Sequence, residues 1–129
     1  SMRKNYSTGA KWEDIVGYCR AVHMGNTLEV SGTVATDGNG VVGKGDMYKQ
    51  TRYILEKIET VLRQAGFALT DVVRTRMYVT DISQWEKVGQ AHGEFFKSIK
   101  PATSMVEVSA LIDPDYLVEI EVTAMKDGN

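Results

Sequence analysis

The chain has 129 residues, of which 43% are hydrophobic and 25% charged, values typical of a globular domain and not of a disordered segment. Its 15 basic and 17 acidic side chains give a net charge of −2. This disfavours nucleic acid as a partner, because phosphate-backbone binding depends on clustered Lys and Arg. No window approaches the roughly 18 consecutive apolar residues that a membrane helix requires. We therefore expect one domain over residues 1–129, of which residues 1–2 include an expression remnant, and no membrane association.

The cysteine and histidine content limits the chemistry. Cys19 is the only cysteine, which excludes an internal disulfide and fits a reducing, cytoplasmic location. The two histidines, His23 and His92, are distant in sequence and have no evident third ligand, so we expect neither a metal nor another cofactor. His92 falls in the apolar stripe of a predicted helix, where a packed, hydrogen-bonded histidine is favoured over a catalyst.

The first clear strand is predicted over residues 27–35. Gly25-Asn26 before it is a turn signal, so residues 19–24 are predicted to form the other arm of a hairpin. Residues 37–45 are rich in glycine but fit neither GxxxxGK[ST] nor GxGxxG, so we expect a loop and not a phosphate-binding site. In the strand, one face is expected to carry Leu28, Val30, Gly32 and Val34, and the other Thr27, Glu29, Ser31 and Thr33.

Apolar residues at helical spacing predict a helix over residues 47–65. Asp46 is placed to cap its start, and Gly66 to end it. A strand is then predicted over residues 72–79. Val73, Thr75, Met77 and Val79 form one face of this strand, and Arg74, Arg76 and Tyr78 the other.

A second helix is predicted to begin at Ser83, where Ser83 and Glu86 have the spacing of a capping box, and to end before Pro101. Gly89 and Gly93 lie within it, although each glycine costs roughly 0.5–1 kcal/mol relative to Ala in a helix. Their spacing of four makes a smooth groove. The groove could accept a closely packed neighbouring element or a ligand.

Two further strands are predicted over residues 104–111 and 117–125, which gives the order β(β)αβαββ. We expect an α/β (α+β) fold with a mixed sheet, parallel neighbours joined by right-handed crossovers, and both helices on one face. The face without helices then needs water or another subunit against it. Its charged side chains are expected to be Arg74, Arg76, Glu107, Glu119 and Glu121.

These carboxylates have two interpretations. Neighbouring carboxylates can acquire different pKa values and act as acid and base. Alternatively, they are cross-strand partners of Arg74 and Arg76, worth a few tenths to about 1 kcal/mol per pair. The second interpretation is favoured for Glu107 and Glu121, whereas both stay open for Glu119.

Several segments resemble a known family. They are residues 76–82 (RMYVTDI), 85–88 (WEKV), 92–96 (HGEFF), 100–108 (KPATSMVEV) and 117–121 (LVEIE), with Gly25-Asn26 leading to Ser31-Gly32. Over roughly residues 18–125 the chain resembles the YjgF/RidA family of reactive-intermediate deaminases. The resemblance implies a chorismate-mutase-like fold and a homotrimer, with sheets facing inward and three small-molecule clefts between subunits.

The resemblance also implies site residues. In the family, 2-imino acids are hydrolysed to 2-keto acids and ammonia. By position, Tyr18 would lie in the cleft, Ser31 and Gly32 would line its floor, and Glu119 would hold the attacking water.

Three further positions depart from the family pattern. Thr103 stands where the deaminases have an arginine that clamps the substrate carboxylate. Met105 stands where a small residue is common, and Gly89 where an asparagine occurs. A hydroxyl cannot supply the charge of a planar guanidinium, so the ligand of this chain is expected to differ from a simple 2-imino acid.

Three functions stay open from the sequence. The first is an enzyme that adds water to an imine or enamine, with Glu119 as general base. The second is a trimer that binds a small metabolite without turnover, which the absence of the arginine favours. The third is an endoribonuclease or translation inhibitor, against which the acidic charge balance argues.

Overall fold

The computed structural model of the chain describes residues 2–127, so Ser1 of the predicted expression remnant lies outside the described residues. Six strands and three α-helices make up the fold, with two short 3-10 turns at Leu69–Asp71 and Ile82–Gln84 within the described residues. The elements in chain order are β1 (Lys4–Tyr6), α1 (Lys11–Val16), β2 (Ala21–Met24), β3 (Thr27–Thr33), α2 (Met47–Gln64), β4 (Val72–Val79), α3 (Trp85–Phe96), β5 (Ala102–Glu107) and β6 (Val118–Met125).

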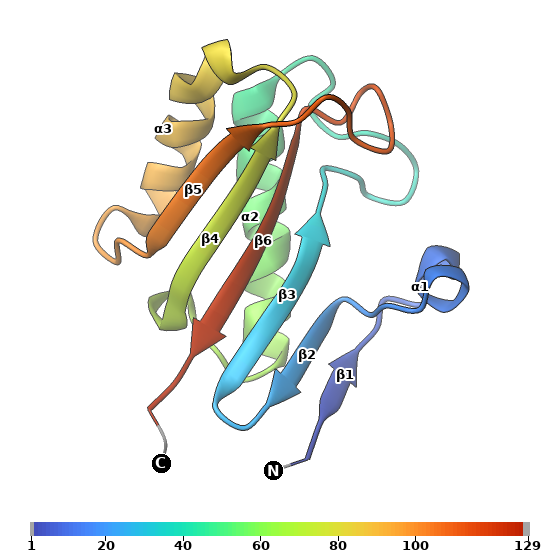
Figure 1. The fold of residues 1–129 in the computed structure, drawn as a ribbon, viewed down its shortest axis with the longest axis vertical. Coiled ribbons are helices and arrows are strands. Elements are labelled where there is room, and N and C mark those ends of the chain that lie inside the picture. The colour runs from blue at the N-terminus through green and yellow to red at the C-terminus, as the bar shows by residue number, and fades with distance from the viewer. Residues whose placement is uncertain (1, 128–129) are drawn as a thin grey trace.

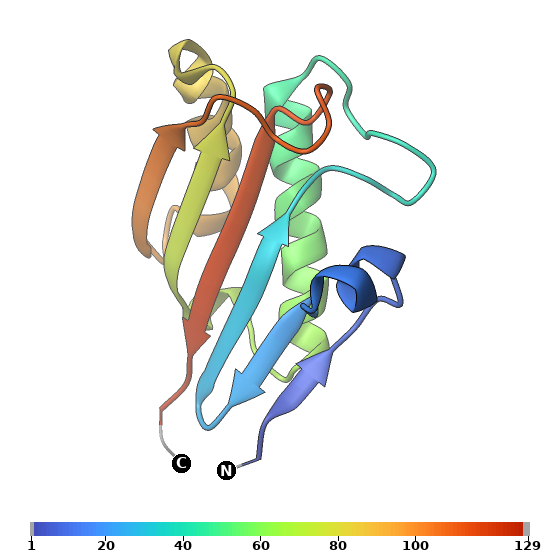
Figure 2. The same cartoon turned by 45° about the vertical axis from the view of Figure 1, so that its right-hand side comes forward.

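The strands form one mixed sheet in the order β1-β2-β3-β6-β4-β5. Figures 1 and 2 show α2 and α3 together on one face of this sheet, as predicted, while α1 stands apart at the β1 edge. The predicted parallel pairing holds for β4 and β5. It is wrong for β3 and β4, because the last strand β6 inserts between them and pairs antiparallel with both.

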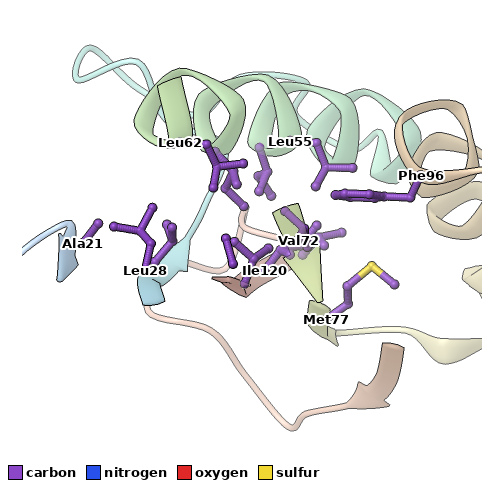
Figure 3. Close-up of a cluster of buried hydrophobic side chains, with 14 of the residues drawn as sticks. Ala21, Leu28, Leu55, Leu62, Val72, Met77, Phe96 and Ile120 are labelled. Atoms are coloured by element: carbon purple, nitrogen blue, oxygen red, sulfur yellow. The ribbon is translucent and has the colours of Figure 1, made fainter. Parts of the chain in front are cut away.

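The core lies between the sheet and the two long helices. Leu55 and Leu62 from α2 and Phe96 from α3 reach down onto Leu28 and Ile120 of the sheet (Figure 3), and all five are buried. Most of the apolar residues whose helical spacing predicted α2 are buried in the structure. The α2 side of this core could therefore be predicted from the sequence.

The helix ends agree only in part with the predicted caps. The Asp46 side chain accepts a hydrogen bond from the backbone N–H of Lys49, and Gly66 follows α2 with a left-handed φ of +82°, as predicted. The predicted Ser83–Glu86 capping box is wrong. Asp81 instead accepts hydrogen bonds from the backbone and hydroxyl of Ser83, because a 3-10 turn precedes α3.

Two strand faces differ from the prediction because of backbone irregularities. A register shift between Val72 and Arg74 buries Val72 and leaves Val73 42% exposed, although Val73 was predicted to face the helices. A second shift, between Val30 and Thr33, buries Thr33. At Gly32 it places the position that a Cβ atom would take on the face away from the core. A bulge of this kind moves every following side chain to the other face.

The predicted faces of β5 are inverted. Met105 pairs with the buried Met77 in parallel register, and Glu107 pairs with the buried Val79. Met105 therefore packs against the core under the helices, and Glu107 shares that face. The prediction that Glu107 lies on the open face is wrong, and it is Val106 that is exposed there.

Candidate functional site

A large open pocket, about 1210 Å³ in volume, lies where the chain enters β2 and leaves β3. Tyr18, Ser31, Gly32 and Glu119 all line it, so the structure brings together four of the predicted site residues. Tyr18 precedes β2, Ser31 and Gly32 lie on β3, and Glu119 lies on β6, the neighbour of β3.

The position of Glu119 depends on the missing side chain of Gly32. A Cβ atom built on Gly32 would lie 2.2 Å from Oε2 of Glu119, far closer than any real contact. The carboxylate therefore rests against the bare backbone of β3. Its neighbours Val118 and Ile120 are fully buried beneath the helices, so alternation places Glu119 on the open face.

The electrostatic surroundings make Glu119 a more basic carboxylate than usual. Burial raises its pKa, the nearby charge of Glu121 raises it further, and Arg20 opposes part of this rise. A raised pKa makes a carboxylate a better acceptor for a proton. Glu119 thus combines contact with the pocket and a pKa raised above its usual value.

Ser31 and Tyr18 contribute differently. The Ser31 hydroxyl donates to the carbonyl of Cys19 at 2.7 Å, so its proton is used inside the protein and only its lone pairs face a ligand. Tyr18 is 41% exposed and supplies an aromatic wall. Ser31 is therefore suited to accept a hydrogen bond from a ligand N–H.

Gly89, Thr103 and Met105 lie elsewhere. Gly89 is on α3, and the other two are on β5, which is separated from β6 by β4. Thr103 and Met105 pair with Thr75 and Met77, which are buried under the helices, so they share that face and not the face of Glu119. Within one chain the structure does not bring these three residues to Glu119.

The Thr103 hydroxyl takes part in an internal hydrogen-bond chain. Its Oγ1 lies 2.8 Å from Oγ1 of Thr75, which in turn lies 2.9 Å from Nε2 of His92. Thr103 also donates to the carbonyl of Pro101 at 3.1 Å. His92 is half-buried against Phe96, and burial lowers its pKa, so the prediction of a packed, hydrogen-bonded histidine is confirmed.

The groove at Gly89 and Gly93 is open. A Cβ on Gly93 would meet nothing within 4 Å, and one on Gly89 would touch only the Trp85 ring at 3.7 Å. Among residues 2–127 no other element packs into this groove, so the structure leaves room there for a ligand or another copy.

The predicted ion pairs of the carboxylates are not formed. Glu121 instead accepts a short hydrogen bond from the Tyr78 hydroxyl, and Glu107 accepts from the backbone N–H of Ile82. Arg74 donates to the Ser104 hydroxyl at 2.7 Å. No ion pair of Arg74 or Arg76 lies within 4 Å in the part of the chain that the structure describes, so the open face is held by neutral partners.

Arg20 and Lys57 also line the pocket, although the sequence placed neither of them there. Nη2 of Arg20 donates to the carbonyl of Gly32 at 2.7 Å, and Nζ of Lys57 donates to the carbonyls of Val34 and Thr36. From the sequence, Arg20 and Arg76 were both candidates to compensate for the missing arginine, but the strand register needed to place either in the cleft was absent.

Over residues 2–127, no cluster of three or more His, Cys, Asp or Glu side chains is arranged to hold a metal ion. In the same residues, no helix has the length and apolar character needed to cross a membrane.

Comparisons with known proteins agree with this architecture. The family model described as Endoribonuclease L-PSP matches residues 8–126. A solved Mycobacterium tuberculosis structure of the YjgF/YER057c/UK114 family is 49% identical, with a TM-score of 0.88, and the match covers 97% of this chain and 100% of that one.

Two curated relatives carry related names. A RutC family protein of Pyrococcus horikoshii is 39% identical over 111 residues, 85% of this chain and 87% of the relative. The 3-aminoacrylate deaminase RutC of Acinetobacter baylyi is 36% identical over 108 residues, 83% of this chain and 85% of the relative. The chain therefore belongs to the Endoribonuclease L-PSP, or YjgF/RidA, family and has its chorismate-mutase-like fold.

Proposed function

We propose that this protein is a homotrimer that hydrolyses imine or enamine metabolites in clefts between its subunits, with Glu119 as general base. The observation that carries the proposal is the half-buried carboxylate of Glu119, held against Gly32 at the floor of a large pocket. The deaminase name of one relative supports the reaction class.

The reaction needs one positioned water and one proton acceptor. A water oxygen adds to the carbon of a protonated C=N bond while Glu119 takes a proton from that water. Glu119 returns its proton to the nitrogen of the resulting carbinolamine, the C–N bond breaks to release ammonia, and the hydroxyl proton passes to that ammonia as the hydroxyl becomes a carbonyl. Water and the iminium ion are thus converted to a keto compound and ammonium. Ser31 accepts a hydrogen bond from the iminium N–H.

The separation of the predicted site residues supports the trimer. Glu119, Tyr18 and Ser31 lie at one end of the sheet's open face, while Thr103 and Met105 lie on the edge strand β5. A cleft containing both groups needs β5 of one copy to approach the pocket of the next. The trimer is tested by light scattering, which should give three times the chain mass of 14.3 kDa.

The activity is tested by release of pyruvate from 2-iminopropanoate generated in solution, measured against protein-free hydrolysis. The native chain should accelerate release, and Glu119→Gln should remove most of the acceleration, because general-base catalysis contributes about 10²–10⁴-fold. Glu56→Gln is the matched control, since Glu56 is exposed on α2 and pairs only with Arg52. Equal rates for native and Glu119→Gln would exclude Glu119 as the base.

A non-catalytic metabolite-binding trimer is the second candidate, favoured by the Thr103 hydroxyl being occupied inside the protein. A ligand that binds only the folded state raises the melting temperature. Ligand-induced stabilisation without acceleration of hydrolysis, in the native chain and in Thr103→Arg, would select this second function.

A further inference from the structure

The guanidinium of Arg20 lies beside the proposed catalytic carboxylate. Arg20 directly precedes β2 and lines the same pocket as Glu119. Its Nη2 donates to the carbonyl of Gly32, the residue against which the Glu119 carboxylate rests. The cation and the carboxylate are therefore anchored to one point of β3, so a ligand beside Glu119 is also beside Arg20.

Arg20 has no directly bonded countercharge among residues 2–127, although its charge acts through space on the pKa of Glu13 and of Glu119. No carboxylate oxygen of residues 2–127 forms an ion pair with it within 4 Å, and its Nε is buried with no hydrogen-bond partner. A buried donor without a partner is costly, and a guanidinium even more so. Because Arg20 lines the pocket, a ligand carboxylate there would give the guanidinium a directly hydrogen-bonded anion.

The other cation of the pocket, Lys57, has two of its three N–H donors engaged by the protein. Nζ of Lys57 donates to the carbonyls of Val34 and Thr36, at 3.2 and 2.9 Å, which ties it to the end of β3. The Tyr18 ring centroid lies 6.0 Å from the Arg20 guanidinium carbon and can bound an anion on one side. Lys57 is therefore fixed at the end of β3, whereas Arg20 follows Tyr18 closely and is bonded to Gly32, beside Glu119.

We infer that Arg20 binds the carboxylate of the substrate and selects small 2-imino and 2-oxo carboxylates. The inference rests on the proposed cleft. Guanidinium binds a planar carboxylate through parallel hydrogen bonds, and the short carboxylate–imine spacing of such a substrate presents its imine carbon toward Glu119. Arg20 then supplies, from the subunit that carries Glu119, the charge that Thr103 lacks. Arg20 is a specificity-determining residue, and proton transfer remains with Glu119.

Direct binding tests this role without turnover. Calorimetric titration with pyruvate and with pyruvamide, its neutral amide, measures how much more tightly the site binds the negatively charged ligand than the neutral one. The native chain should bind pyruvate at least about tenfold more tightly than pyruvamide. Arg20→Met should weaken pyruvate binding by about ten- to a hundredfold and leave pyruvamide nearly unchanged, which a purely structural role would not do. Arg63→Met removes the same charge from the exposed end of α2 and should keep the native preference.

Each outcome decides the assignment. Equal affinity of the native chain for the two ligands, no detectable pyruvate binding, or an unchanged preference in Arg20→Met would overturn it. If Arg20→Met does not fold, Arg20→Lys keeps the positive charge without the planar fork, and a preference intermediate between native and none is expected. A native chain that prefers pyruvate but does not accelerate imine hydrolysis would refute the proposed reaction and keep Arg20 as the carboxylate site.

Discussion

The substitution Gly32→Ala perturbs the candidate site at a single atom. The added Cβ would lie 2.2 Å from Oε2, 3.0 Å from Cδ and 3.3 Å from Cγ of Glu119, and it meets no backbone atom among its three nearest neighbours. The flexible carboxylate must therefore move by about 1 Å while the strand stays in place. Misplacing a catalytic group by about 1 Å costs about 10²-fold in rate, so kcat/KM should fall by about a hundredfold.

The stability of the fold should hardly respond. Gly32 does not have a left-handed φ, so alanine fits its backbone, and the free energy of unfolding should change by less than about 1 kcal/mol. Imine hydrolysis and urea denaturation measure the two effects separately. The double variant with Glu119→Gln is the control, because the two losses should not add if Gly32 acts through Glu119. Native activity in Gly32→Ala, or fully additive losses, would refute the reasoning.

Three further predictions concern stability. Gly93→Ala adds a methyl in open space within α3 and should raise the free energy of unfolding by roughly 0.5–1 kcal/mol in urea titration; a loss would mean that the groove is occupied. Leu55→Ala empties a fully buried position and should cost about 2–5 kcal/mol by the same measurement, whereas a cost below about 1 kcal/mol would contradict the described core. Burial and Glu121 raise the pKa of Glu119 above 4.5, so its contribution to stability is present at low pH and lost as pH rises through the raised pKa. Melting temperatures from about pH 4 to about pH 8 should therefore fall for the native chain relative to Glu119→Gln, and parallel curves would contradict the raised pKa.

The helical core could be predicted because its signal is local and repeated. Residues buried along α2 recur at helical spacing, and Asp46 marks where the repeat begins. The capping box failed for a local reason too, since Asp81 lies two residues closer to β4 and captures the amide of Ser83 before the helix starts. Competing caps of this kind differ by about 1 kcal/mol and have similar sequence patterns.

The strand faces and the sheet order could be predicted only in part. Nothing in the sequence of β6 indicates that it inserts between β3 and β4, because strand order depends on contacts far apart in the chain. In β5, Met105 and Val106 are both apolar, so alternation alone could not decide which is buried. The pairing of Thr103 with Thr75 decides it, and the two bulges shift β3 and β4 by single residues that carry no distinct signal.

The same register explains why Thr103 does not act in place of an arginine. With Thr103 donating to the carbonyl of Pro101, Thr75 donates to Thr103, and Nε2–H of a neutral His92 donates to Thr75. Every hydroxyl proton is then used in joining α3, β4 and β5. A residue committed in this way provides no proton and no charge to a ligand. The proposal therefore assigns carboxylate binding to the start of β2, where Nε of Arg20 has no hydrogen-bond partner among residues 2–127, and not to Lys57, which donates to two backbone carbonyls.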